Sequence, residues 1–113
     1  MRNTQYIRVG DILCPVRLYA GRASYIPFQY RKHQLTFISD IGVFSKERVD
    51  YGSRVLLDCM DIQANQRSLL DVGCGYGTLG VSLKKEYPWL HVEMVDVNER
   101  AVHLANQSCQ YND

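Results

Sequence analysis

Three glycines at alternate positions, followed at a distance by an acidic residue, form the part of this sequence best suited to binding chemistry. Residues 71–77 read DVGCGYG, and Asp96 follows 19 residues after Gly77. Glycine permits backbone angles, and a close approach of a ligand, that a Cβ atom would block. In dinucleotide-binding folds an acidic residue about 20 positions after such a loop accepts hydrogen bonds from ribose hydroxyls. We therefore expect Gly73, Gly75 and Gly77 to surround a nucleotide-like ligand whose ribose is held by Asp96.

Two cofactors compete for this pattern, and a carboxylate in front of the loop distinguishes them. NAD-binding loops follow the spacing GxGxxG and place a pyrophosphate at the amino terminus of a helix. Here the glycines follow GxGxG, with Gly80 next, and Asp71 immediately precedes the loop. A carboxylate there repels a pyrophosphate but attracts a ligand that carries an ammonium and a sulfonium. The residues favour S-adenosylmethionine over NAD, and the remaining alternative is a ligand-free turn between strand and helix.

The elements around the loop are those of an α/β protein with a parallel sheet. Residues 68–72 predict a short apolar strand, residues 78–86 a helix that Pro88 stops, and residues 91–96 a second strand. Asn98 is expected to cap a third helix. The order strand, glycine loop, helix, strand, helix is typical of a βαβ unit. The apolar face of the third helix is predicted to consist of Ala101, Leu104, Ala105 and Cys109.

The first half of the chain gives weaker signals. The run QLTFIS at residues 34–39 alternates and predicts a strand. Asp50 is expected to cap a helix that runs to about residue 60. Residues 1–27 contain only short apolar pieces between glycines and prolines, so we interpret them as a divergent, irregular or β-rich lead-in. The apolar side of the helix is predicted to hold Val55, Leu56, Cys59 and Met60, opposite Arg54 and Asp58.

The composition excludes several classes of function. The chain has 113 residues, enough for one small domain, with 13 basic and 12 acidic side chains and a formal charge of +1. This balance provides no bulk field that would attract nucleic acid or a membrane surface, so a nucleic-acid partner would need a local patch. No apolar run reaches the roughly 18 residues of a membrane span, and the 4 cysteines and 3 histidines have no metal-ligand spacing. We expect a cytoplasmic protein with free thiols and no metal site.

Three separated segments resemble one enzyme family in the order that the family has them. They are FISDIGVFSKERVDYGS at residues 37–53, DVGCGYG at 71–77 and VDVNERAV at 95–102. Together they are similar to the small-domain group of class I S-adenosylmethionine-dependent methyltransferases, whose best-known members methylate N2 of guanine in small-subunit ribosomal RNA. The resemblance covers about residues 28–113 and implies a partial Rossmann-like fold preceded by the lead-in at 1–27.

The resemblance also implies roles for individual residues. It assigns the cofactor loop to Asp71, Gly73, Gly75 and Gly77, the ribose to Asp96, and a place beside the adenosyl group to Asn98. It puts Phe44 and Ser45 near the cofactor on the loop that enters the domain. RNA is the implied substrate, with its target base single-stranded or flipped out of the stack.

One family motif has no counterpart in this sequence. The catalytic Asn-Pro-Pro segment is absent, since Pro15, Pro27 and Pro88 each stand alone. We therefore expect a carboxyl-terminally truncated methyltransferase that holds the cofactor-binding part and is inactive alone. The alternatives are a non-catalytic cofactor-binding or interaction remnant and a fragment of an NAD-dependent oxidoreductase. Without further strands, the apolar strand at 68–72 has an open edge, which predicts self-association.

Overall fold

A computed structural model describes residues 4–8, 23–40 and 49–113 of the chain. Phe44 and Ser45 lie outside these described residues, so their predicted place near the cofactor stays a prediction. The strands are β1 (Thr4–Arg8), β2 (Ala23–Tyr30), β3 (His33–Asp40), β4 (Ser68–Val72) and β5 (His91–Asp96). The helices are α1 (Tyr51–Cys59), α2 (Thr78–Glu86) and α3 (Glu99–Tyr111).

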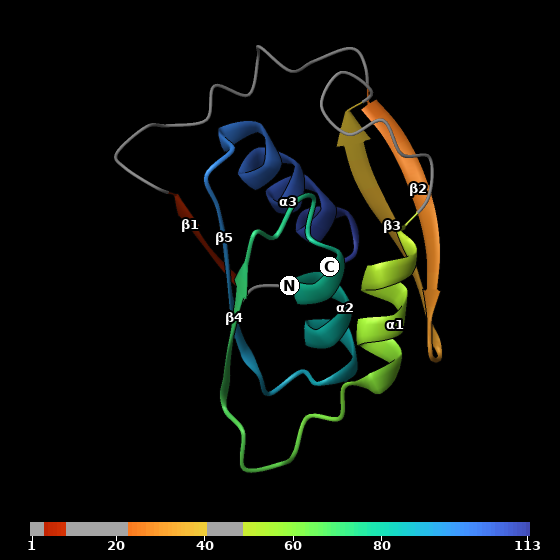
Figure 1. Cartoon of the computed structure of the whole chain (residues 1–113), viewed down its shortest axis with the longest axis vertical. Coiled ribbons are helices and arrows are strands. Elements are labelled where there is room, and N and C mark those ends of the chain that lie inside the picture. The colour runs from red at the N-terminus through yellow and green to blue at the C-terminus, as the bar shows by residue number, and fades with distance from the viewer. Residues whose placement is uncertain (1–3, 9–22, 41–48) are drawn as a thin grey trace.

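The described elements form layers (Figure 1). A parallel sheet with the strand order β1-β5-β4 forms one side, and the antiparallel hairpin of β2 and β3 lies on the other. Helices α2 and α3 lie between them, and each contacts both β5 and β3. The core fills the space between the helices and the two sheets, with Val92 and Met94 of β5 and Leu35 and Phe37 of β3 fully buried. This α/β arrangement with a parallel sheet confirms the predicted fold class.

The predicted βαβ unit is present with the expected bounds. Strands β4 and β5 pair in parallel and are joined by α2, which begins directly after the glycine loop. Asn98 caps α3 as predicted, because its side-chain oxygen accepts from the backbone amides of Arg100 and Ala101. The four residues of the predicted apolar face, Ala101, Leu104, Ala105 and Cys109, are all buried. Apolar periodicity and one cap were sufficient to define this half of the fold.

Strand β2 includes the end of the stretch that the sequence indicated only as an irregular or β-rich lead-in. Thr36 lies opposite Pro27, and its amide and carbonyl bond to the side chain of Asn112 at 2.9 and 2.7 Å. The Thr36 backbone therefore faces away from β2, and the missing amide of Pro27 removes no hydrogen bond between the strands. Strand β2 extends across residues 27 and 28, where the lead-in was expected to end. The boundary between a lead-in at 1–27 and a methyltransferase part at 28–113 stays a prediction.

The predicted apolar side of α1 was wrong for Val55, Leu56 and Cys59, which are exposed, whereas Met60 packs against the core. Leu57 is the buried residue of this helix, whereas Val55 and Leu56 are 40% and 46% exposed. Within the described residues this 9-residue helix packs against α2, and the positions that become buried are fewer than its apolar residues. Helical spacing identified the helix and its Asp50 cap, but it did not identify the side that is covered.

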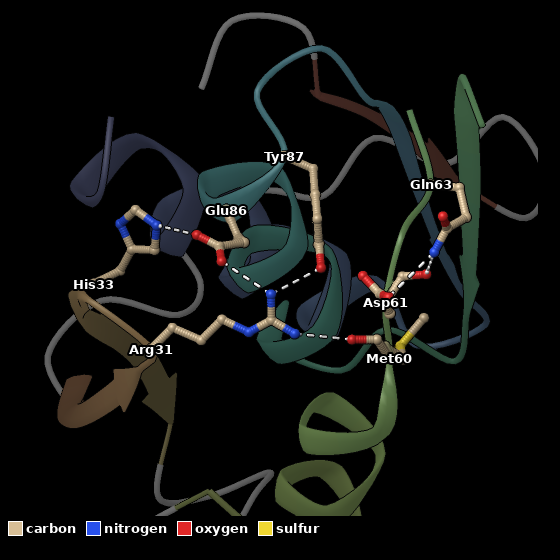
Figure 2. Close-up of polar contacts among 7 residues, drawn as sticks. All are labelled: Arg31, His33, Met60, Asp61, Gln63, Glu86 and Tyr87. Carbon is tan, nitrogen blue, oxygen red and sulfur yellow. Dashed lines mark hydrogen bonds and ion pairs between the residues drawn. The ribbon is translucent and has the colours of Figure 1, made fainter. Parts of the chain in front are cut away.

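The turn of the hairpin is attached to the ends of two helices through Arg31 (Figure 2). The Arg31 guanidinium donates to Glu86 Oε2, to the Tyr87 hydroxyl and to the Met60 carbonyl, each at 2.9 Å. His33 Nε2 lies 3.0 Å from the other Glu86 oxygen. These hydrogen bonds lower the pKa of Glu86 below its ordinary value, the one from Arg31 most strongly. They connect the hairpin to the carboxyl ends of α1 and α2.

Strand β4 pairs with β5 alone among the described strands, and none of these strands pairs with its other edge. The described helices leave two of its apolar side chains uncovered, since Leu70 and Val72 are 57% and 74% exposed. Parallel strands are normally covered on both faces. The expected self-association through this edge stays a prediction, and the exposed side chains give a physical reason for it.

Candidate functional site

The glycine loop runs from the end of β4 to the start of α2 with three left-handed residues. Gly73, Gly75 and Gly77 have φ angles of +73°, +56° and +101°. L-residues with a side chain rarely adopt such angles, which explains the alternation of glycines in the sequence. The amides of Gly73 and Cys74 donate to the carbonyl of Val95 at 2.8 and 3.0 Å. These bonds fix the loop to the carboxyl end of the neighbouring strand.

The three glycines serve different purposes. No atom lies within 4 Å of the position that a Cβ atom would occupy at Gly73 or Gly75, so their φ angles and an approaching ligand are the reasons for glycine there. At Gly77 a Cβ atom would lie 3.2 Å from Val81 and 3.5 Å from Ala105, so this glycine also allows α2 and α3 to pack closely. The open side of Gly73 and Gly75 leaves room for the close approach that a nucleotide-like ligand needs.

Asp96, at the end of β5, extends its carboxylate to this loop. Its Oδ2 accepts from the amide of Gly75 at 3.0 Å, and its Oδ1 accepts from the amide of Asn98 at 2.9 Å. Two backbone donors therefore fix the orientation of the carboxylate, and each oxygen keeps a further lone pair for a ligand hydroxyl. The distance between Asp96 and the glycines is short because parallel strands end at the same edge of the sheet.

Asp71 lies beneath the loop and is 7% exposed. Its Oδ2 accepts from the amide of Gly80 in the first turn of α2 at 3.2 Å. Burial raises the pKa of this carboxyl to about 6, and the negative charge of Asp96 adds to the increase, while the Gly80 hydrogen bond opposes it. Asp71 thus carries a negative charge at neutral pH in a place where water screens it poorly.

The other two side chains of the loop belong to the core. Tyr76 is buried, and its ring centroid lies 5.8 Å from that of Phe37 on β3. Burial, with the negative charges of Asp71 and Asp96, raises the pKa of the Cys74 thiol to about 12. Cys74 therefore lacks the thiolate that a nucleophile needs, and its buried side chain is a small packing residue.

The structure brings six of the eight predicted site residues to one end of the sheet: Asp71, Gly73, Gly75, Gly77, Asp96 and Asn98. Gly80 contributes a feature that the sequence did not explain, since a Cβ atom there would lie 2.5 Å from Sδ of Met94. It lets α2 pack directly on β5 and so positions the loop. The glycine itself was visible in the sequence, but its neighbour on β5 was not.

Comparison with known proteins identifies the family of this chain. Residues 34–113 match the family model "Methyltransferase small domain". Because this match includes most of the chain and all of the glycine loop, the chain belongs to this family. The class I methyltransferase resemblance that the three sequence segments indicated is thereby confirmed. Within the described residues, no helix is both long and apolar enough to cross a membrane.

Individual relatives are considerably longer than the part they share with this chain. A Bacillus subtilis protein named YbxB is 47% identical over 85 residues, which are 75% of this chain and 42% of the relative. Ribosomal RNA small subunit methyltransferase C of Hahella chejuensis is 44% identical over 71 residues, 63% of this chain and 20% of the relative. Ribosomal RNA large subunit methyltransferase G of Shewanella sediminis is 37% identical over 71 residues, 63% of this chain and 17% of the relative. The chain thus spans between a sixth and two fifths of the length of these relatives.

Proposed function

We propose that this chain binds S-adenosylmethionine and forms the cofactor-binding part of a methyltransferase that acts on N2 of guanine in ribosomal RNA. The observation that carries the proposal is the loop with open space beside Gly73 and Gly75, next to the carboxylate of Asp96. Membership of the methyltransferase small-domain family supports the reaction class. Relatives named as ribosomal RNA methyltransferases support RNA as the substrate. The proposed place of action is the cytoplasm.

In this proposal each residue of the site has a physical role. Asp96 accepts hydrogen bonds from the ribose hydroxyls, with its carboxylate already oriented by two backbone amides. Gly73 and Gly75 allow the ligand to approach the backbone. Asp71 supplies a poorly screened negative charge, which favours a ligand with an ammonium and a sulfonium. Asn98 lies next to Asp96 and is assigned to the adenosyl side by the resemblance.

Two further residues and the chemical step complete the proposal. Phe44 and Ser45 are assigned to the cofactor by the resemblance alone. When bound, the cofactor would supply an electrophilic methyl group on its sulfonium. Transfer of that methyl to the guanine amine would break the C–S bond, leave S-adenosylhomocysteine and release one proton from the amine. An enzyme accelerates such a reaction by holding donor and acceptor in a near-attack geometry. The base must be unpaired or flipped out to reach the site.

A calorimetric titration of the purified chain with S-adenosylhomocysteine and with NAD tests the cofactor assignment. We expect saturable micromolar binding of S-adenosylhomocysteine and none of NAD. Asp96→Asn should weaken the affinity at least about tenfold, because a charge-assisted hydrogen bond to ribose contributes roughly 1.5–3 kcal/mol. Asp61→Asn is the matched control, because this exposed carboxylate lies in the loop after α1. Preference for NAD would contradict the proposal.

A methyl-transfer assay on ribosomal RNA tests whether this stretch transfers a methyl group by itself. Since the sequence lacks the Asn-Pro-Pro segment of the family, we infer that this stretch binds the cofactor without transferring the methyl group. The assay uses radiolabelled S-adenosylmethionine and RNA from which methyl groups are absent. We expect no incorporation above that of an Asp96→Asn variant. Incorporation that the Asp96 change abolishes would overturn the inference.

A further inference from the structure

A hollow lies between β2 and α1, away from the glycine loop. It has a volume of about 280 Å³, close to that of a small-ligand site. Neither the glycine loop nor Asp96 contributes to it. The hollow is lined by Pro27, Phe28, Gln29, Val49, Arg54 and Asp58.

One wall of this hollow is apolar and suited to a flat ring. Phe28 is partly buried and packs against the core, with its ring centroid 6.1 Å from that of Phe37. It therefore presents an anchored aromatic surface rather than a mobile one. Pro27 beside it is exposed and rigid in its backbone. Unpaired nucleobases stack on such surfaces, and each stacked base contributes roughly 1–3 kcal/mol.

The other wall carries one donor and one acceptor of opposite charge. Arg54 and Asp58 are exposed and stand four residues apart on α1, so they lie on the same side of the helix. Across the ranges 4–8, 23–40 and 49–113, neither of them forms an ion pair or a side-chain hydrogen bond. Both charges therefore remain available to a ligand.

We propose that this hollow binds an unpaired RNA nucleotide and prefers guanine. The base would stack on Phe28, and Arg54 would contact a phosphate. Guanine presents a ring N–H and an amino group side by side on one edge, and these two donors match the two oxygens of Asp58. Uracil and cytosine lack this pair of adjacent donors. The hollow therefore holds an RNA nucleotide at a site separate from the cofactor loop and takes no part in the chemical step.

The hollow is connected to the glycine loop through the core. Phe28 contacts Phe37, and Phe37 in turn contacts Tyr76 of the loop at a centroid distance of 5.8 Å. A nucleotide in the hollow would thus be supported by the same hairpin that packs on the loop. This inference rests on the proposed function, because it takes RNA to be the substrate.

Guanosine and uridine 5′-monophosphates are the probes for this site. Each is titrated into the full chain at low salt by calorimetry, with and without saturating S-adenosylhomocysteine. We expect guanosine monophosphate to bind at least about fivefold more tightly than uridine monophosphate, the discrimination typical of a bidentate contact to a base edge. Saturating S-adenosylhomocysteine should leave this affinity unchanged, because the two sites are separate.

Two exposed positions provide the variants, so neither change removes a core contact. Asp58→Asn should abolish the preference for guanine. Arg54→Ala should lower the affinity for both nucleotides by the same factor. Asp61→Asn and Arg67→Ala are the matched controls, because both residues are exposed and neither lines the hollow. The controls should leave both affinities unchanged.

The outcomes separate this inference from the proposed function. Absence of nucleotide binding in a chain that binds S-adenosylhomocysteine overturns the RNA site and leaves the cofactor site intact. Competition between guanosine monophosphate and S-adenosylhomocysteine also overturns it. So does a result in which Asp58→Asn and Arg54→Ala bind the nucleotides with the same affinities as the wild type. A guanine preference that Asp58→Asn abolishes supports the site, even in a chain that does not bind S-adenosylhomocysteine.

Discussion

Replacing Asp71 by Asn should stabilise the fold and weaken cofactor binding at the same time. Burial raises the pKa of Asp71 from its ordinary value of 3.8 to about 6. One pKa unit corresponds to about 1.4 kcal/mol, so the ionised carboxylate destabilises the unliganded fold by up to about 3 kcal/mol. Asn has nearly the same shape and keeps an oxygen that can accept from the amide of Gly80.

The sign of the pH dependence follows from linkage. Between pH 3.8 and about 6 the folded state binds more protons at Asp71 than the unfolded state, so rising pH removes stability over this interval. Above about pH 7 the ionised Asp71 carboxylate destabilises the wild-type fold in full, whereas Asp71→Asn has no such destabilisation. The stability advantage of the variant should therefore be largest at pH 8 and small near pH 4.

Urea denaturation of both proteins at pH 4 and pH 8 measures this difference. We expect Asp71→Asn to gain about 2–3 kcal/mol at pH 8 and less than 1 kcal/mol at pH 4. Titration with S-adenosylhomocysteine at pH 8 should show weaker binding, because the charge that attracts the ammonium and the sulfonium is lost. An equal gain at both pH values, or a loss of stability at pH 8, would refute this account of Asp71.

Three further predictions follow from the packing. Gly80→Ala should destabilise the fold by about 1–3 kcal/mol in urea denaturation, because its Cβ would overlap Met94 on β5; unchanged stability would show that Met94 moves aside without cost. Exposed Cys59 should react with a thiol reagent at pH 8 far faster than Cys74, whose pKa is raised to about 12 by burial; peptide mapping of the labelled thiols measures the ratio, and equal rates would contradict it. Sedimentation velocity should show concentration-dependent association that Val72→Lys reduces, since this exposed side chain lies on the edge strand β4; a monomer at all concentrations would exclude association through this strand.

The sequence alone determined the elements whose signals are local. The order of strand, loop, helix, strand and helix from residue 68 onward followed from apolar periodicity, and the Asn98 cap followed from residue type. The positive φ angles of Gly73, Gly75 and Gly77 agree with the same kind of local signal, because glycine is the residue that adopts such angles most readily. The three segments that resemble the family were also sufficient to indicate its class.

The tertiary structure decided the features that depend on partners distant in the chain. Pro27 is compatible with a strand because the backbone of Thr36, opposite to it, bonds to Asn112, 85 residues after Pro27, and not to β2. Leu57 is the buried residue of α1 because neighbouring elements cover that side, which helical spacing cannot show. The pKa of Asp71 depends on how deeply the packing of α2 and β5 buries it. Residue type and spacing thus establish which groups are present, whereas burial and the distances between groups arise only when the chain packs on itself.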